Sequence, residues 1–268
     1  GYMFYLLFFL GVGLIIGSFL NVVFIRTERE EDYIGGRSHC DTCSTTLAWY
    51  DNIPVWSYLF LGGKCRSCKA LIPSQHLWFE LGTGGAFLWV AALFFDPLSP
   101  ETWLTTLWLC ILVSLCILIV VSDVVSMEIP LVFLVSSTVV TALYTTLYFL
   151  FFERQLPIFE TTLWNSALGG LCAWAFFFLL VYFSKETWMG WGDVWIALTG
   201  GMAVGVKLTL LMLTTAFASG ALFGLSLLFW HKKNLQTQVP FAPFLVLGIL
   251  CILSIEQVRP EWLRFFMW

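Results

Sequence analysis

Eight apolar stretches, separated by short polar breaks, constrain this chain more than any other feature of its sequence. They lie near residues 3–25, 77–96, 102–122, 130–152, 161–184, 194–206, 207–230 and 240–258. A helix that crosses a bilayer needs about 20 apolar residues, and only the sixth stretch, which is rich in glycine, falls well short. Charged residues make up 11% of the chain, against about 25% in ordinary soluble domains. We therefore expect an all-α polytopic membrane protein with about eight transmembrane helices.

The distribution of Lys and Arg predicts the orientation in the membrane. Nine of the 13 basic residues fall on the cytoplasmic side when the first loop is placed inside, and positive loops favour that side. The first apolar stretch has no small-residue cleavage site and leads into a basic loop, so we expect a span and not a cleaved signal peptide. No basic stripe indicates nucleic acid; the expected non-protein partner is the lipid bilayer.

One sizeable polar insertion interrupts this pattern, at residues 26–76. It suggests three parts: a first transmembrane helix over 1–25, a cytoplasmic loop domain over 26–76, and a transmembrane core over 77–268.

The insertion carries two Cys-x-x-Cys pairs, with 21 residues between them. The four cysteines are Cys40, Cys43, Cys65 and Cys68. This spacing is close to that of zinc ribbons, in which four thiolates hold one structural Zn²⁺. Disulfides do not persist in a cytoplasmic loop, although a thiol redox site stays an alternative. His39 and His76 lie nearby but are superfluous to a four-thiolate site.

Two aspartates stand where apolar stretches meet the membrane boundary. Asp123 ends the third stretch and Asp193 begins the sixth, so the topology brings both to the cytoplasmic face. Two close carboxylates share one proton, and such a pair can activate water against a peptide bond, as in aspartic proteases. Gly190 and Gly192, just before Asp193, would let a substrate backbone approach closely.

Simpler interpretations of the acidic residues are open. Asp193 suits a helix N-cap, Asp123 suits a solvated helix end, and Glu128 and Glu186 lie near the same boundary. A proton-coupled transporter could also use two boundary carboxylates, although we find no paired broken helices in two halves of the chain.

Five segments, taken in order, resemble one known family. They are "GSFLNVVFIR" (17–26), "CDTCSTTLAWYDNIPVWSYLFLGGKCRSCKALIPSQHLWFE" (40–80), "DVVSMEIP" (123–130), "GWGD" (190–193) and "PFAPFLVLG" (240–248). Together they resemble the type IV prepilin peptidases, which are membrane aspartic proteases. The resemblance covers nearly the whole chain, and the ordered set is far more specific than any single segment.

The resemblance implies a function and a set of roles. It implies cleavage of the basic leader of prepilins or pseudopilins after a glycine, at the cytoplasmic face of the bacterial inner membrane. It also implies methylation of the new N-terminal residue with S-adenosylmethionine. Asp123 and Asp193 would then be catalytic, and the four cysteines would hold structural zinc. Asn21, Arg26 and Glu80 are candidates for supporting the substrate or the methyl donor.

One position departs from the family pattern. A lysine commonly follows the second aspartate by two residues, and here that position is Trp195. The change suggests an altered ionisation of the acid pair or a specialised substrate. A presenilin-like protease also carries Gly-x-Gly-Asp, but the cysteine pairs and the closing "PFAPF" argue against it.

Overall fold

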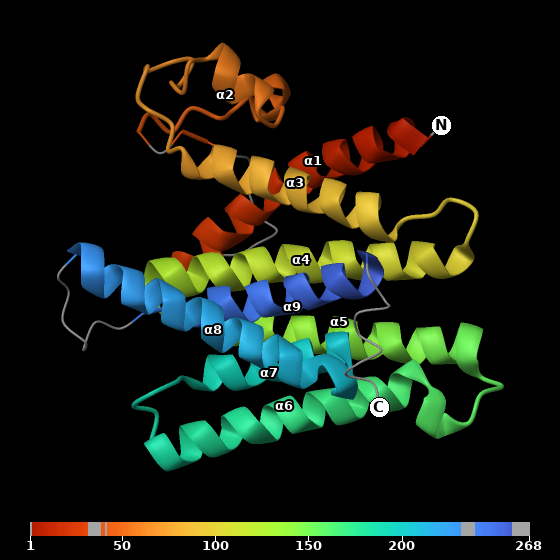
Figure 1. Cartoon of the computed structure of the whole chain (residues 1–268). Coiled ribbons are helices and arrows are strands. Elements are labelled where there is room, and N and C mark those ends of the chain that lie inside the picture. Colours follow the sequence, from red (N-terminus) through yellow and green to blue (C-terminus); the bar gives the residue numbers. More distant parts are fainter. Residues whose placement is uncertain (1, 32–38, 41, 232–238, 259–268) are drawn as a thin grey trace. The chain divides into compact units, whose positions relative to one another are not determined.

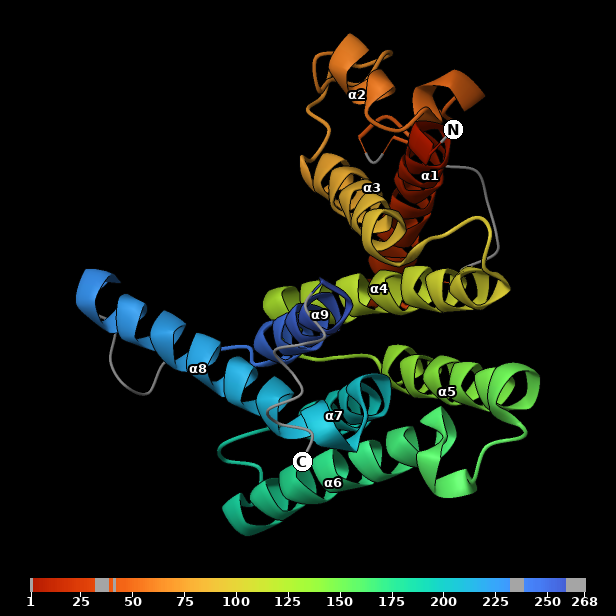
Figure 2. The same ribbon diagram turned by 45° about the vertical axis from the view of Figure 1, so that its right-hand side comes forward.

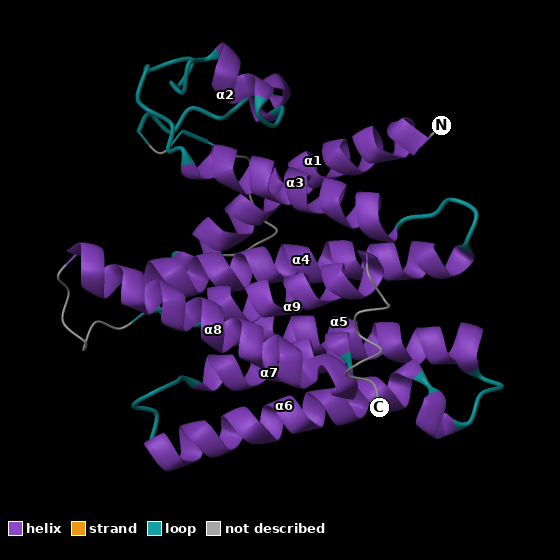
Figure 3. Ribbon diagram, in the orientation of Figure 1, coloured by secondary structure: helices purple, strands orange, loops and turns teal. Residues whose placement is uncertain are grey.

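The computed structural model describes residues 2–31, 39–40, 42–231 and 239–258, and nearly all of their regular structure is helical. Within these ranges β-structure is limited to two isolated bridges, His39 with Thr46 and Lys64 with Leu71. Figure 3 shows helices joined by short loops, with the longest loops in the insertion. The all-α prediction is confirmed.

Each predicted apolar stretch forms a helix, with ends within a few residues of those expected. The helices are α1 (Tyr2–Glu28), α3 (Gln75–Phe94), α4 (Pro100–Ser126), α5 (Leu131–Tyr148), α6 (Thr162–Ser184), α7 (Trp191–Val204), α8 (Val206–His231) and α9 (Ala242–Val258). In the described part of the chain, six of them are long and apolar enough to cross a membrane, while α7 and α9 are shorter. Helices satisfy their own backbone hydrogen bonds, and this is required in a bilayer because lipid tails offer the backbone no partners. The chain is therefore a multi-pass membrane protein.

The chain forms two compact units, Gly1–Phe95 (unit 1) and Asp96–Trp268 (unit 2). Unit 1 contains α1, the polar insertion and α3, so the first two long helices belong together. The three parts expected from the sequence, 1–25, 26–76 and 77–268, were defined by their expected functions and not by how the helices pack. That division stays a prediction.

In unit 1, α1 and α3 pack closely through small residues. A Cβ added to Gly17 of α1 would lie 2.5 Å from the carbonyl oxygen of Phe79, and one added to Gly13 would lie 2.9 Å from the Cα of Gly84. Small residues allow apolar helices to approach closely enough for backbone contact. Figure 1 shows the two helices crossing, and Figure 2 shows the insertion near the start of α3, where it carries the short helices η1 (Trp49–Asn52) and α2 (Trp56–Phe60).

In unit 2, α7 packs against α5, α6, α8 and α9. Its contact with α6 is so close that a Cβ on Gly201 would collide with the carbonyl oxygen of Gly169. Figure 1 shows the end of α4, the start of α7 and the start of α9 at the same end of this unit. The fold thus gathers three helix ends that are far apart in the sequence.

Candidate functional site

Asp123 lies in the last turn of α4, where it meets the start of α9. Asp123 is only 9% exposed, and its Oδ2 accepts a hydrogen bond of 3.0 Å from the backbone N–H of Ala242. The helix ends at Ser126, and Met127 adopts a left-handed conformation that turns the chain away. Asp123 is therefore not the solvated helix end that a simpler interpretation suggested.

Asp193 lies in the first turn of α7 and is 8% exposed. Gly190 occupies the N-cap position, so Asp193 is not the N-cap itself. Instead its Oδ2 accepts a hydrogen bond of 3.3 Å from the backbone N–H of Gly190. This is one of the two hydrogen bonds of a capping box, the one from the N-cap backbone to the side chain three residues later. Gly190 has no side chain to make the other. A capping contact is present, but it leaves the second carboxylate oxygen for other partners.

The two aspartates line one cavity of about 760 Å³ and interact electrostatically. The wall around them is formed largely by the loop before α7, the turn after α4 and the segment before α9. It consists of Met127, Ile129, Leu131, Leu134, Glu186, Thr187, Trp188, Met189, Gly190, Trp191, Gly192, Trp195, Val239, Pro240 and Phe241. Among these described residues the only charged one is Glu186, which is acidic. The cavity suits an extended, partly apolar ligand that carries positive charge.

Of the other acidic candidates, Glu186 belongs to this wall and Glu128 does not. Glu186 accepts a hydrogen bond of 2.7 Å from Trp191 Nε1, which ties the loop before α7 to the helix that carries Asp193. Glu128 is exposed and lies outside the lining. Neither replaces Asp123 or Asp193 as the buried pair.

The two glycines before Asp193 differ in their surroundings. A Cβ on Gly190 would meet nothing closer than 4.0 Å, whereas one on Gly192 would come within 3.2 Å of Ile129 Cδ1. Gly190 thus borders open space in the cavity, and Gly192 allows α7 to pack against the turn after α4. Trp195 is half-buried and forms part of the same wall.

The four cysteines of unit 1 converge, with their sulfur atoms all within 4.8 Å of one another. Each pair lies in a tight turn closed by one of the two bridges, and the residue after each second cysteine has positive φ, at Ser44 and Lys69. The distance from Cys40 Sγ to Cys68 Sγ is 3.8 Å. Four sulfurs bound at 2.3 Å in a tetrahedron are also about 3.8 Å apart. The cluster therefore fits a single metal ion.

Local hydrogen bonds favour the thiolate form of two of these cysteines. Hydrogen bonding with the side chain and backbone of Thr45 lowers the pKa of Cys43 to about 6. Backbone hydrogen bonds from Cys68 and Ser67 lower the pKa of Cys65. Thiolates are the metal-binding form of cysteine. Among the described residues His39 and His76 lie outside the cluster, as expected.

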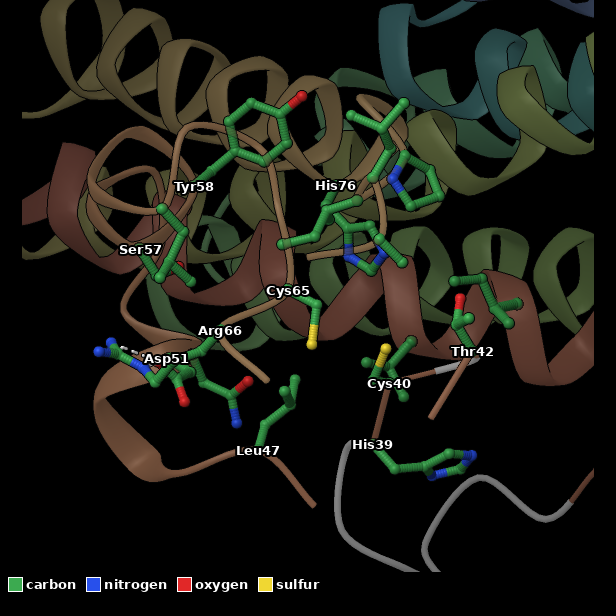
Figure 4. A pocket seen from close by; sticks show the side chains of 18 of the residues that line it. His39, Cys40, Thr42, Leu47, Asp51, Ser57, Tyr58, Cys65, Arg66 and His76 are labelled. Carbon is green, nitrogen blue, oxygen red and sulfur yellow. Dashed lines mark hydrogen bonds and ion pairs between the residues drawn. The ribbon is translucent and has the colours of Figure 1, made fainter. Parts of the chain in front are cut away.

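A second cavity, of about 230 Å³, lies beside the cysteine cluster in unit 1. Figure 4 shows Cys40 and Cys65 at this cavity, together with His76 and the pair formed by Asp51 and Arg66. Those two side chains form an ion pair with an N–O distance of 2.8 Å. The sequence analysis did not predict this cavity, because its wall is assembled from α1, the insertion and the start of α3.

The three supporting residues proposed from sequence converge on this region. Arg26 and Glu80 line the cavity. Asn21 is fully buried and donates through Nδ2 to His76 Nδ1 at 2.7 Å, while its Oδ1 accepts from Gln75 Nε2 at 3.0 Å. Asn21 thus positions a cavity residue without lining the cavity itself.

Comparison with known proteins links both units to one group. A profile of the Bacterial Peptidase A24 N-terminal domain matches residues 12–94, and one of the Type IV leader peptidase family matches residues 110–225. No solved structure matches the chain.

Three relatives have the same name, Prepilin leader peptidase/N-methyltransferase. The protein of Vibrio cholerae is 30% identical, over 76% of this chain and 79% of its own length. The protein of Bacillus subtilis is 29% identical over 88% of both chains, and that of Stutzerimonas stutzeri is 27% identical over 95% of this chain and 92% of its own. The similarity therefore extends over both cavities.

Proposed function

This chain belongs to the type IV leader peptidase family, and on that premise we propose that Asp123 and Asp193 are the catalytic pair of a membrane aspartic endopeptidase. One observation carries the proposal: two buried carboxylates, 70 positions apart in the sequence and on different helices, face one cavity and interact. Two such groups cannot both ionise comfortably, so they share one proton. Their ionisation belongs to the pair and not to either residue alone.

The hydrogen bonds suggest how the roles divide. The N–H of Ala242 reaches Asp123 at 3.0 Å, while that of Gly190 reaches Asp193 at 3.3 Å. A hydrogen bond to a carboxylate favours its ionised form. Asp123 is then the base that takes a proton from water, and Asp193 the acid that polarises the peptide carbonyl. The water oxygen attacks the carbonyl carbon, and the proton passes to the leaving nitrogen.

We propose a prepilin or pseudopilin as the substrate, cut after a glycine at the cytoplasmic face of the bacterial inner membrane. The cavity that contains Asp123 and Asp193 is suited to a basic leader, since opposite charges attract. Gly190 borders its open space, which leaves room for an extended backbone.

The test is cleavage of a co-expressed prepilin with a Gly-Phe junction, followed by mass spectrometry. Asp123→Asn and Asp193→Asn should each reduce cleavage by at least about a thousandfold, because an amide can neither accept the proton nor share it. Glu128→Gln is the matched control, since this exposed carboxylate lies outside the cavity. Retained cleavage in either aspartate variant would refute the pair.

We propose further that the four cysteines hold a structural Zn²⁺. The close approach of four sulfurs, all within 4.8 Å of one another, supports this identity, because four cysteine ligands are typical of structural Zn²⁺. Four thiolate ligands leave no open position on the metal, so its role is to shape the insertion.

We also propose that the cavity of unit 1 binds S-adenosylmethionine, which supplies a methyl group to the new N-terminal amine. The ligand has a carboxylate, an ammonium group and ribose hydroxyls, and the wall offers a guanidinium and a carboxylate at Arg26 and Glu80. Arg26 would hold the ligand's carboxylate, as guanidinium groups commonly do. Glu80 would accept from its hydroxyl or ammonium groups.

Binding of the methyl donor to the purified protein separates this proposal from the peptidase. Arg26→Gln should weaken binding in calorimetry by about tenfold or more, since a charge-assisted hydrogen bond is lost. Cleavage should persist while methylation falls. Arg154→Gln, an exposed arginine of unit 2, is the control. Unchanged binding in Arg26→Gln would exclude this cavity.

A further inference from the structure

One face of the short helix α2 exposes three large apolar side chains. Trp56, Leu59 and Phe60 are 63%, 62% and 82% exposed. They occupy positions i, i+3 and i+4, which share one side of a helix. The rings of Trp56 and Phe60 are stacked, with centroids 5.9 Å apart. We call these three residues the outer face of α2.

The opposite side of α2 is occupied by the cavity of unit 1. Ser57, Tyr58 and Leu61 are each half-buried, and all three line that cavity. The helix is therefore fixed in its rotation about its own axis, and the outer face must point away from the cavity. Exposed apolar residues that cluster on one side of a helix commonly mark a binding surface.

A hydrogen bond places α2 at the level where α3 enters its apolar span. The backbone N–H of Val55, directly before α2, donates to Glu80 Oε2 at 2.7 Å. Glu80 lies five residues into α3, which begins at Gln75, or about 7.5 Å along the helix. Figure 1 shows α2 near the N-terminal end of α3. Trp78, in the first turns of α3, is 69% exposed.

The segment that follows α2 exposes two lysines, Lys64 and Lys69, next to the second cysteine pair. Over residues 26–76 the six basic and six acidic residues balance, so any attraction to a phospholipid surface is local to these two side chains. The third basic residue of this segment, Arg66, is paired with Asp51. Basic residues next to a membrane attract anionic headgroups.

We propose that the outer face of α2 lies in the interface between headgroups and acyl chains, and anchors the insertion to the bilayer surface. Tryptophan is enriched at this interface because it has a large apolar ring and an N–H donor. A short helix with aromatic and aliphatic side chains on one face is typical of helices that lie in the membrane plane. The level of α2 beside α3 favours lipid over a soluble protein partner, which would need this face clear of the membrane.

Photocrosslinking of the full-length protein in nanodiscs tests the proposal. The substitution Phe60→p-benzoylphenylalanine should give phospholipid adducts in mass spectrometry after illumination. Tyr58→p-benzoylphenylalanine is the matched control, an aromatic position on the cavity side of the same helix. We expect the lipid adduct to be about tenfold more abundant at position 60 than at position 58, since only the outer face meets lipid.

The outcomes distinguish the possible occupants of the face. Adducts to protein at position 60, no adduct there, or equal lipid yields at positions 58 and 60 would each overturn the proposal. Trp56→p-benzoylphenylalanine, one turn earlier on the same face, should repeat the lipid result if the first variant fails to fold.

Nanodiscs with phosphatidylglycerol should give a higher yield than phosphatidylcholine alone, and Lys64→Gln with Lys69→Gln should abolish that difference. A yield independent of lipid charge would contradict the part assigned to the lysines.

Discussion

At the scale of single residues, the ionised form of Asp123 is supported by a hydrogen bond from the backbone. The N–H of Ala242 donates to its Oδ2 across 119 positions of sequence. Most substitutions at Ala242 would leave this donor in place, because only proline lacks a backbone N–H. The contact gives a specific role to the start of α9, which the "PFAPF" segment spans.

Ala242→Pro should remove this hydrogen bond and place a ring carbon where the N–H faces the carboxylate. Ala242 is the first residue of α9, a position where proline is well tolerated. Without the donor the ionised carboxylate is less stable, so the acid limb of the pH–cleavage profile should move to higher pH. The profile of a prepilin reporter measures this. Ala242→Ser keeps the N–H and should leave the profile in place; an unchanged profile in the proline variant would show that the contact does not tune the pair.

The residues of the acidic cavity were predictable from sequence to different degrees. Asp123 and Asp193 stand out because carboxylates at apolar boundaries are rare. Asp123 ends the third apolar stretch and Asp193 begins the sixth, so both are expected on the same side of the membrane. The Ala242 N–H has no such signal, since every residue but proline has one. Trp195 was recognisable as a departure, and it does lie in the cavity wall; its effect on ionisation or substrate choice stays a prediction.

At the scale of helices, the position of Asp193 depends on how closely α7 approaches α6. Gly169 and Gly201 face each other so closely that neither has space for a Cβ. Apolar helices in lipid gain little from burying more apolar surface, so such close packing contributes much of their association. The contact lies two turns beyond Asp193 on the same helix.

Gly201→Ala should therefore destabilise the protein and reduce cleavage together. The added methyl group meets the Gly169 carbonyl, and overpacking of this kind costs about 1–3 kcal/mol. Thermal unfolding in detergent and reporter cleavage measure the two effects. The matched control is Gly224→Ala in α8, where an added Cβ meets nothing within 4 Å and alanine should be neutral or slightly stabilising. Equal stability of the two variants would contradict the packing argument.

Helix positions were predicted well, because an apolar run long enough to span a bilayer has few alternatives. The start of α7 was less accurate: the expected 194–206 begins at Trp191 in the structure. The first turn contains Gly192 and Asp193, and an assignment based on the apolar run leaves these two residues outside the helix. The short helices η1 and α2 were not predicted, since pieces of four and five residues depend on tertiary contacts such as that between Val55 and Glu80.

At the scale of the whole molecule, the two sites belong to different units. The cysteine cluster and the smaller cavity lie in unit 1, and the acid pair lies in unit 2. Loss of the metal should therefore affect the two proposed activities unequally. This division did not follow from the sequence, because α3 resembles the other apolar helices and its packing with α1 is a tertiary property.

Chelation of the metal should reduce methylation by about tenfold or more, because the fold of a small metal site depends on its ion, and should affect cleavage much less. Mass spectrometry of a co-expressed prepilin reports both reactions, and elemental analysis reports zinc. Cys40→Ser with Cys65→Ser should lose the zinc, while Cys172→Ser, an exposed cysteine of α6, should keep about one ion per chain. Zinc-free protein with full methylation would refute the structural role of the metal.

The division into two consecutive units also has a consequence for biosynthesis. Every ligand of the metal site and both helices that frame it lie before residue 96. At the usual rate of about 5–20 residues per second, the residues of unit 2 need roughly 10–35 s more to be made. Unit 1 can thus insert, fold and take up its metal while the ribosome is still making the helices that carry the acid pair. The chain would then acquire its proteolytic site last.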